Sequence, residues 1–520
     1  MKLRRIKILQ FILIVLVLLL FLRVDYRFKN NIECCSDEYD YFIHASTIVE
    51  DFDFDYSNQD LRDFKFINGS ISAPVGFVGT GILTAPFLFI GKMLNQIFNE
   101  SIDKNIFNFQ IFIYSMSSVF YFFLSYIYLY KTMKLIGNSI NKYYLLLLFG
   151  SSGLVYYAFE RFGMTHVFEV FTLTILIYNL VKYYLIDNKN LVKLLIPPLL
   201  FLSFLVRMSN FYIFLIPIIV EKILKKKFEI NKSLIKEKYF VISLIASAIF
   251  YVNLLISIYG KFILNPQTIY GDTRSAVDYF GSPNSFLATF IDIFNSSLNI
   301  LFTFEFGIFW MSPILFYGTL KSLSLLKEYK DIENWLIFLC FTQNFVIIHL
   351  WQSAASSYGF RYLLTLLPLC FFLFFTSDIN QKINSYLLLF SIFSLLGVMF
   401  FETTQLTQLS TTDELNSFGR TIRYVQPDYV KGVVLALFSF ESYLIIFTTS
   451  FLGATVFKFF LILFGKTSFI KFLTYFNLPT ENSDFQIYLN NLTQINLIKF
   501  LIIIFIFSLF AYKVIYKLDK

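Results

Sequence analysis

Long apolar runs alternate with short charged stretches along almost the whole chain. A helix needs about 20 apolar residues to cross roughly 30 Å of hydrocarbon. The pattern therefore predicts an all-α polytopic membrane protein with about 11–13 transmembrane helices. The runs are Leu9–Leu22, Ile106–Tyr130, Tyr143–Ala158, His166–Leu185, Val192–Val206, Phe211–Val220, Tyr239–Tyr259, Leu301–Leu320, Leu336–Leu350, Leu363–Phe375, Tyr386–Phe401, Val433–Phe464 and Ile495–Tyr512.

The first run begins after basic residues and resembles a signal peptide, but Arg23 and Asp25 follow it in place of a small-residue cleavage site. We therefore expect an uncleaved first helix with a cytoplasmic N-terminus, which makes residues 23–104 a large external loop. Within that loop, Ile82–Leu94 is apolar but short, and Pro86 interrupts it. This favours a helix lying in the interface over a span.

Lysines crowd the linker at residues 222–238, and by the positive-inside rule this linker is cytoplasmic. Residues 260–300 and 402–430 are then external. The run at Val433–Phe464 is too long for one span and contains Glu441, so the pattern leaves open the side on which the C-terminus lies.

Composition agrees with this interpretation. Of the 520 residues, 57% are hydrophobic and 15% are charged, against about 25% charged in soluble domains. The net charge of +8 does not indicate a nucleic-acid partner, because the basic residues cluster beside the apolar runs. The four cysteines show no zinc-site spacing and predict no disulfide framework.

Acidic residues concentrate directly after the first run, where residues 33–63 hold ten of the chain's 35 acids. After Asp37 and Glu38, apolar residues recur at helical spacing and predict an amphipathic helix on the membrane surface. Asp37, Tyr41 and His44 would share one face of this helix. A carboxylate held there could act as a general base. The alternative is a solvated acidic loop.

The alternating acids Asp51, Asp53 and Asp55 suggest a metal site. A calcium loop of the EF-hand type needs Gly at its sixth position and Glu at its twelfth, where this chain has Tyr56 and Arg62. A manganese site for a nucleotide-sugar would need a soluble α/β domain, which the pattern does not predict. The alternation of acid and aromatic residues instead favours a short half-buried strand. Participation of a divalent metal elsewhere stays open.

Further polar residues fall near the ends of predicted spans, toward the external side. Ionisable residues beside hydrocarbon are costly and often functional, although each could simply reach for water at the interface. Their convergence on one face makes them candidates for substrate binding. They are His44, Glu160, Arg161, His166, Arg207, Trp351, Tyr358 and Arg361.

In their order and spacing, several stretches resemble the GT-C class of integral-membrane glycosyltransferases, which includes protein O-mannosyltransferases and lipid A aminoarabinose transferases. The resemblance covers about residues 1–400, and residues 401–520 form a C-terminal membrane region without an assigned role. Ala73–Gly76 stands where relatives often have His-Pro or Pro-Pro, which leaves the sugar open. The stretches are Ser36–Phe42, Val78–Phe87, Tyr156–Glu160, Met164–His166, Phe204–Arg207, Gly307–Pro313, Trp351 and Ser357–Tyr362.

The resemblance implies a GT-C fold and an inverting sugar transfer at the outer face of the membrane, which in a bacterium is the inner membrane. The donor would be a sugar on a polyprenyl phosphate, and the acceptor a lipid, glycan or protein. Asp37 would be the catalytic base, with Glu38 beside it. Arg161, Arg207 and Arg361 would be the candidates to bind the phosphate, because a guanidinium matches its geometry.

Two other classes stay open. A polysaccharide polymerase or ligase would also use lipid-linked sugars but would favour an external loop late in the chain, such as residues 402–430. A transporter or flippase would place ionisable residues near the middle of the membrane and would often contain inverted repeats. This chain has no internal repeat, and its polar residues lie toward one face.

Overall fold

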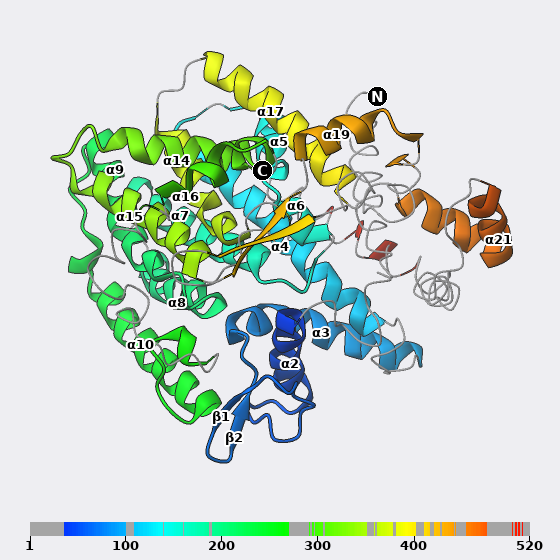
Figure 1. Ribbon diagram of the computed structural model, residues 1–520. Coiled ribbons are helices and arrows are strands. Elements are labelled where there is room, and N and C mark those ends of the chain that lie inside the picture. Colours follow the sequence, from blue (N-terminus) through cyan, green and yellow to red (C-terminus); the bar gives the residue numbers. More distant parts are fainter. Residues whose placement is uncertain are drawn as a thin grey trace, which may run out of the picture.

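The computed structural model describes most of the chain between residues 36 and 475, and nearly all of its elements are helices (Figure 1). The described residues are 36–99, 109–138, 140–159, 161–186, 190–269, 291, 294–295, 297–304, 307–350, 358, 361–377, 381–401, 410–415, 421–426, 429–440, 442–443, 454–475 and six residues between 502 and 512.

The longer helices are α2 (Ser36–Glu50), α3 (Val78–Phe98), α4 (Phe109–Leu135), α7 (His166–Leu185), α8 (Asn190–Val206), α9 (Ile216–Phe228), α10 (Lys238–Tyr259), α14 (Pro313–Leu325), α15 (Ile332–Leu350), α16 (Leu367–Thr376), α17 (Gln381–Phe400) and α21 (Ala454–Tyr475). The shorter helices are α5 (Lys142–Gly150), α6 (Leu154–Phe159), η1 (Phe211–Leu215), η2 (Leu234–Lys236), η3 (Pro266–Thr268), α13 (Ile308–Met311), η4 (Arg361–Leu366) and α19 (Tyr429–Leu437). The strands form two antiparallel pairs, β1 (Phe66–Asn68) with β2 (Ile71–Ala73) and β3 (Ser410–Leu415) with β4 (Thr421–Gln426).

Within the described part of the chain, five helices are long and apolar enough to cross a membrane, namely α3, α4, α7, α10 and α17. Helix α8, most of α15 and the continuous η4–α16 segment are apolar but shorter. The chain is thus mainly helical and compatible with a membrane environment. The predicted first span, Leu9–Leu22, and most of Ile495–Tyr512 lie outside the described residues.

The predicted span Tyr143–Ala158 is wrong as a single helix, because a turn divides it into α5 and α6. Gly153 in this turn has a φ of 81°, which glycine adopts without strain. Ser394 of α17 donates its hydroxyl to the Ser151 carbonyl at 2.7 Å and so satisfies an acceptor at the helix end. Hydropathy does not reveal this break, since the turn is as buried as the helices beside it.

Two other predicted runs are also divided, whereas one predicted interruption is absent. Leu301–Leu320 breaks at Ser312, where Pro313 begins α14, a position at which a helix needs no backbone donor. Val433–Phe464 overlaps both α19 and α21. Helix α3, in contrast, continues through Pro86 for 21 residues, because packing against α2, α4 and α8 stabilises it. It is therefore longer than the interfacial helix predicted at Ile82–Leu94.

Helix α7 lies in the centre and packs against α4, α8, α9 and η4. Helices α2 and α3 and the β1–β2 hairpin lie together at one end of the molecule (Figure 1). The first turn of α7 approaches this end, since Thr165 before it hydrogen-bonds to Thr80 of α3 at 2.8 Å. The core thus presents the N-terminal end of α7 toward α2 and α3.

Candidate functional site

Helix α2 forms the middle of this end of the molecule. The sequence correctly predicts a helix here, but the amphipathic surface helix is wrong: Glu38–Thr47 is buried on every side. Helix α3 covers α2 on one side, and the loop at residues 51–77 folds over another. Asp37, in the first turn, is only half-buried, so part of its side chain stays accessible at the surface of the protein.

Two glycines of the stretch Val78–Phe87 allow α3 to approach its neighbours very closely. A Cβ atom on Gly81 would lie 2.4 Å from the Cβ of His44 in α2. A Cβ on Gly79 would lie 2.3 Å from the backbone nitrogen of Val206, at the end of α8. Because real Cβ atoms do not make such contacts, only glycine permits this packing, which brings α2 to the ends of α7 and α8.

Asp40 and His44 attach the 51–77 loop to α2. Arg62 donates to both Asp40 carboxylate oxygens, at 3.0 and 2.6 Å, and the Gly76 amide donates to one of them. The Nε2 of His44 donates to the Gly76 carbonyl at 2.8 Å, which leaves Nδ1 to accept from the Tyr56 hydroxyl at 2.6 Å. Both ring nitrogens are therefore used within the protein, and the substrate-binding role expected for His44 has no free atom to perform it.

Burial acts in opposite directions on these two groups. It lowers the pKa of His44 from its usual value to about 4, so the ring is neutral. Burial also raises the pKa of Asp40 to about 6, although the adjacent Arg62 opposes the shift. The 51–77 loop carries the acids at 51, 53 and 55. These do not form the predicted strand, because the Asp53 and Asp55 carboxylates accept backbone N–H groups two residues ahead and stabilise turns.

Glu38 and Arg161 form a buried ion pair that joins α2 to the turn before α7, with Nε 2.9 Å from Oε1. The Glu38 side chain also packs on Gly163, where a Cβ would come within 2.9 Å of it. Glu38, predicted as a catalytic residue, and Arg161, predicted as a phosphate ligand, are therefore bound to each other. Glu160, the neighbouring candidate, lies outside the described residues.

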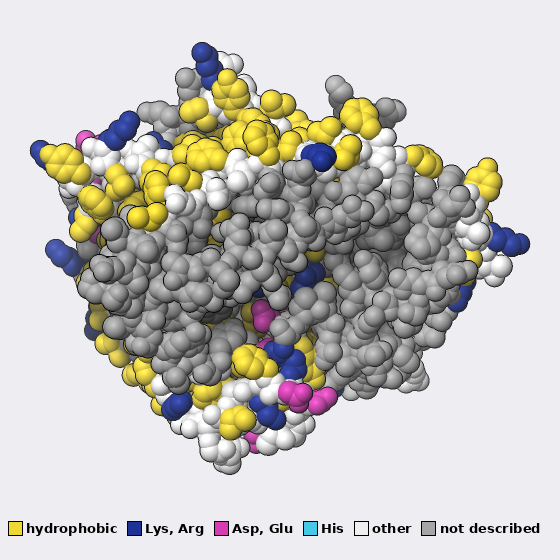
Figure 2. Space-filling view, in the orientation of Figure 1, with side chains coloured by type: hydrophobic (Ala, Val, Ile, Leu, Met, Phe, Trp, Pro, Cys, Tyr) yellow, Lys and Arg dark blue, Asp and Glu magenta, His cyan; other side chains and the backbone are white. Residues whose placement is uncertain are grey.

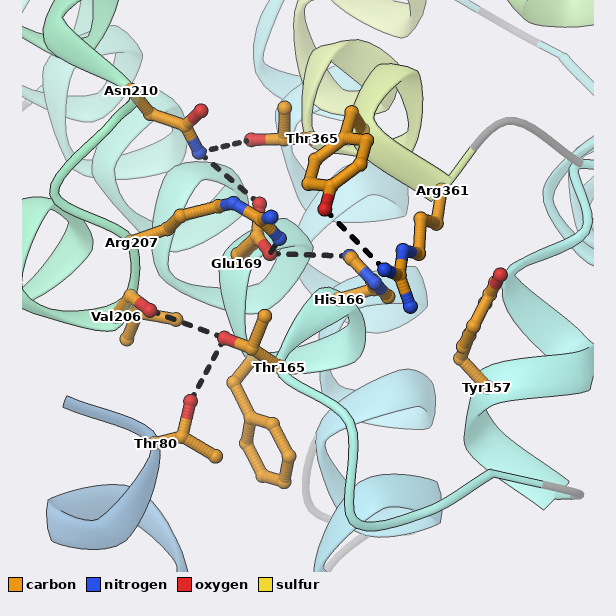
Figure 3. Close-up of polar contacts among 12 residues, drawn as sticks. Thr80, Tyr157, Thr165, His166, Glu169, Val206, Arg207, Asn210, Arg361 and Thr365 are labelled. Carbon is orange, nitrogen blue, oxygen red and sulfur yellow. Dashed lines mark hydrogen bonds and ion pairs between the residues drawn. The ribbon is translucent and has the colours of Figure 1, made fainter. Parts of the chain in front are cut away.

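A second charged cluster centres on Glu169, in the first turn of α7 (Figure 3). Its Oε1 accepts from Arg207 at 3.0 Å and lies 3.2 Å from Nδ1 of His166. Its Oε2 accepts from the Asn210 side chain at 3.1 Å. All four side chains are buried. The structure thus brings together the predicted residues His166 and Arg207, and it adds Glu169 as the acid that holds them.

Arg361 begins η4 and lies beside this cluster (Figure 3). It donates to the Tyr362 hydroxyl at 3.3 Å. The Arg207 guanidinium lies over the ring of the same tyrosine, 4.2 Å from the ring centre. Asp37 is close enough to act electrostatically on Arg361. Among the residues that the structure describes, neither the Asp37 carboxylate nor the Arg361 guanidinium forms an ion pair.

The remaining candidates contribute less. Tyr358 is fully buried, and its hydroxyl bonds to the Tyr429 hydroxyl at 2.8 Å, so it supports packing rather than facing the site. The Tyr157 hydroxyl donates to the Tyr358 carbonyl at 2.8 Å. Trp351 lies outside the described residues. Where side chains are described, no three of His, Cys, Asp and Glu lie close enough together to hold a metal ion.

Glu169 is the residue that the sequence analysis missed. It is an acid inside the apolar run His166–Leu185, three residues after a histidine, and an ionisable residue in such a run is a functional candidate in its own right. Figure 2 shows acidic and basic side chains close together over the region of α2. The arrangement thus contains one carboxylate and one guanidinium, on Asp37 and Arg361, that form no ion pair among the described residues.

Comparison with known proteins gives no relative, because no family model, no curated protein and no solved structure matches the chain.

Proposed function

We propose that this protein is a membrane glycosyltransferase of the GT-C kind, which moves a sugar from a polyprenyl-phosphate donor to an acceptor at the outer face of a membrane. The observation that carries the proposal is the pair formed by Asp37 and Arg361. The negative charge of Asp37 favours the charged form of Arg361, and neither group forms an ion pair among the described residues. Three other buried charges nearby, Glu38, Glu169 and Arg207, already have partners of opposite charge.

In this proposal Asp37 takes the proton from the acceptor hydroxyl or amine as that atom attacks the anomeric carbon. The bond between the anomeric carbon and the phosphate oxygen breaks, and the phosphate leaves with the electron pair. Arg361 stabilises the negative charge that develops on the leaving phosphate. Attack from the side opposite the phosphate inverts the configuration. The Glu38–Arg161 pair keeps the first turn of α2, and hence Asp37, against the start of α7.

The position of the charges supports transfer over transport. Glu169 is the fourth residue of the 20-residue helix α7, and Arg207 directly follows the end of α8. Both therefore lie near helix ends that face α2, whereas a transporter would favour charges near the middle of its spans.

The decisive experiment measures transfer from a labelled polyprenyl-phosphate sugar in proteoliposomes. Asp37→Asn keeps the size of the side chain but cannot accept a proton, so transfer should fall by about 100-fold or more while donor binding remains. Asp63→Asn, an exposed acid in the following loop, is the matched control and should keep normal activity. Near-normal turnover of the Asp37→Asn variant would refute the proposal. Loss of activity in Asp53→Asn would instead favour a metal site in the 51–55 segment.

A second variant tests the phosphate site. Arg361→Ala should raise the donor KM by about tenfold or more, because a charge-assisted contact to the phosphate is lost. Membrane insertion should be unchanged. Lys65→Ala, which removes an exposed positive charge from the 51–77 loop, should leave the donor KM unaltered. If Arg361→Ala binds donor normally but expresses poorly, Arg361 is structural and the assignment is wrong.

A further inference from the structure

Glu169 is connected to η4 by two separate routes, although it lies on another element. In the first route, Arg207 binds Glu169 and lies over the ring of Tyr362, the second residue of η4. In the second, Asn210 donates from the same Nδ2 to Glu169 at 3.1 Å and to the Thr365 hydroxyl at 3.2 Å. Thr365 is the fifth residue of η4, so both ends of this short helix are fixed relative to one carboxylate (Figure 3).

Arg361 depends on this arrangement for its position. Arg361 donates a hydrogen bond to the Tyr362 hydroxyl. Arg207 packs over the Tyr362 ring and so holds that hydroxyl toward the Arg361 guanidinium. His166, which lies 3.2 Å from Glu169, contacts the same ring edge-on with centroids 6.3 Å apart. Glu169 therefore orders the surroundings of Arg361 without touching it.

Stability alone is a weak reason for such a cluster. Removing a carboxylate and a guanidinium from water costs more than their attraction typically returns, and well-packed apolar residues often serve equally well. Glu169 and Arg207 have 1% and 7% of their side-chain surfaces exposed. A buried ion pair of this kind beside a guanidinium that forms no ion pair among the described residues is better explained by the need to place a charge.

We propose that Glu169 is the positioning residue of the donor-phosphate site, and that it acts on Arg361 through Arg207–Tyr362 and through Asn210–Thr365. This inference rests on the proposed function, since it assigns Arg361 to the phosphate. The inference implies that Glu169 affects donor affinity much more than the chemical step, because among the described residues Glu169 forms no hydrogen bond or ion pair with Asp37.

The test compares Glu169→Gln, Tyr362→Phe and the double variant. Glu169→Gln keeps the shape but not the charge that holds Arg207, and should raise the donor KM about tenfold with kcat within about twofold. Tyr362→Phe removes only the hydroxyl that accepts from Arg361 and should raise KM about fivefold. Because both changes act on one chain of contacts, the double variant should be clearly less than additive. Binding of polyprenyl monophosphate, followed by thermal shift, should weaken in parallel.

A matched control separates positioning from general loss of stability. Glu237 pairs with Lys193 at 2.8 Å at the opposite end of α8, about 21 Å from Arg207 along that helix. Glu237→Gln breaks an ion pair as well and should lower the melting temperature but leave the donor KM unchanged. Normal donor KM in Glu169→Gln and Tyr362→Phe, or fully additive effects, would overturn the positioning role while Asp37→Asn still tests the transfer. A wild-type protein that neither binds polyprenyl monophosphate nor transfers sugar would instead refute the proposed function itself.

Discussion

At the residue scale, the distinction that matters is between charges with partners and charges without them. Around α2, the carboxylates of Glu38, Asp40 and Glu169 each bind an arginine. Asp37, one residue from Glu38, forms no ion pair within the described part of the chain. Adjacent residues on a helix point about 100° apart, so one acid faces the protein while its neighbour faces the site. This is a physical reason to expect different effects from Asp37→Asn and Glu38→Gln.

His44 gives a prediction about pH. Its pKa is lowered to about 4 in the folded protein, against about 6.5 when exposed. Between these values His44 binds a proton when the loop is detached from α2 but not when the loop covers it, so folding of the 51–77 segment onto α2 should weaken as the pH falls from about 6.5 to 4. Asp40, whose pKa is raised to about 6, acts in the opposite direction. A comparison with His44→Gln therefore isolates the histidine.

Amide hydrogen exchange of residues 51–77 is the measurement. Protection in the wild type should exceed that in His44→Gln at pH 7, and the difference should shrink by up to about 3 kcal/mol on going to pH 4. A difference that does not change with pH would show that His44 does not titrate in this range.

The sequence pattern makes Arg207 and Arg361 candidates because they lie at the ends of apolar runs, where a polar residue differs from its surroundings. It makes Asp37 a candidate because this acid lies in the first turn of the helix predicted after the first run. It did not separate free charges from paired ones. Arg161 and Arg207 bind acids far away in the chain, and no local pattern records such pairs. Glu169 was missed because the apolar run around it was interpreted only as a span.

At the element scale, apolar runs predicted helices well and helix breaks poorly. Helix α7 matches its predicted bounds, His166–Leu185, whereas the breaks near Gly153 and Ser312 depend on contacts with α17. The Ser394 hydroxyl lies 2.7 Å from the Ser151 carbonyl and 2.6 Å from the Met311 carbonyl, so its single proton is shared between the two breaks. A hydropathy pattern does not show that a hydroxyl far away in the chain supplies a hydrogen bond to the carbonyls at a helix break.

The close packing of α3 gives a prediction at this scale. Gly79→Ala would place a methyl group 2.3 Å from the Val206 backbone, which cannot move like a side chain. We expect a loss of about 3 kcal/mol of stability, with transfer impaired because α3 and the Thr80–Thr165 hydrogen bond shift. Gly150→Ala is the control, since its new Cβ would meet its nearest neighbour at an ordinary 3.7 Å. Thermal unfolding in detergent measures both, and equal melting temperatures would contradict the packing argument.

At the scale of the whole molecule, charge differs between the two ends. The loop after α2 is rich in acids, whereas the end containing α9 and η2 carries the lysines of residues 222–238. Some of these lysines are paired, as Lys225 is with Glu221 at 2.6 Å and Lys226 with Asp331 at 2.5 Å. The lysines of this segment that have no acidic partner among the described residues leave an excess of positive charge, and the positive-inside rule predicts that such an excess lies in the cytoplasm.

This asymmetry predicts the topology. In intact cells, an impermeant thiol reagent should label a cysteine at exposed Asn58 but not one at exposed Lys236, in a chain whose Cys34 and Cys35 are replaced by serine. Both should react after the membrane is opened. Labelling at 236 alone, or at both positions in intact cells, would refute the predicted orientation and with it the placement of Asp37 outside.

The separation of partners along the chain also bears on how the molecule is made. The contacts Asp40–Arg62 and His44–Gly76, which attach the loop to α2, and Glu50–Lys92, which joins α2 to α3, all lie within the first hundred residues. The contacts of the site need Arg161, then Arg207 and finally Arg361. During translation, the proposed base and its supporting loop can therefore assemble early, while the arginine proposed to bind the phosphate is added only after two-thirds of the chain has been synthesised. The complete site can therefore form only during the last third of synthesis.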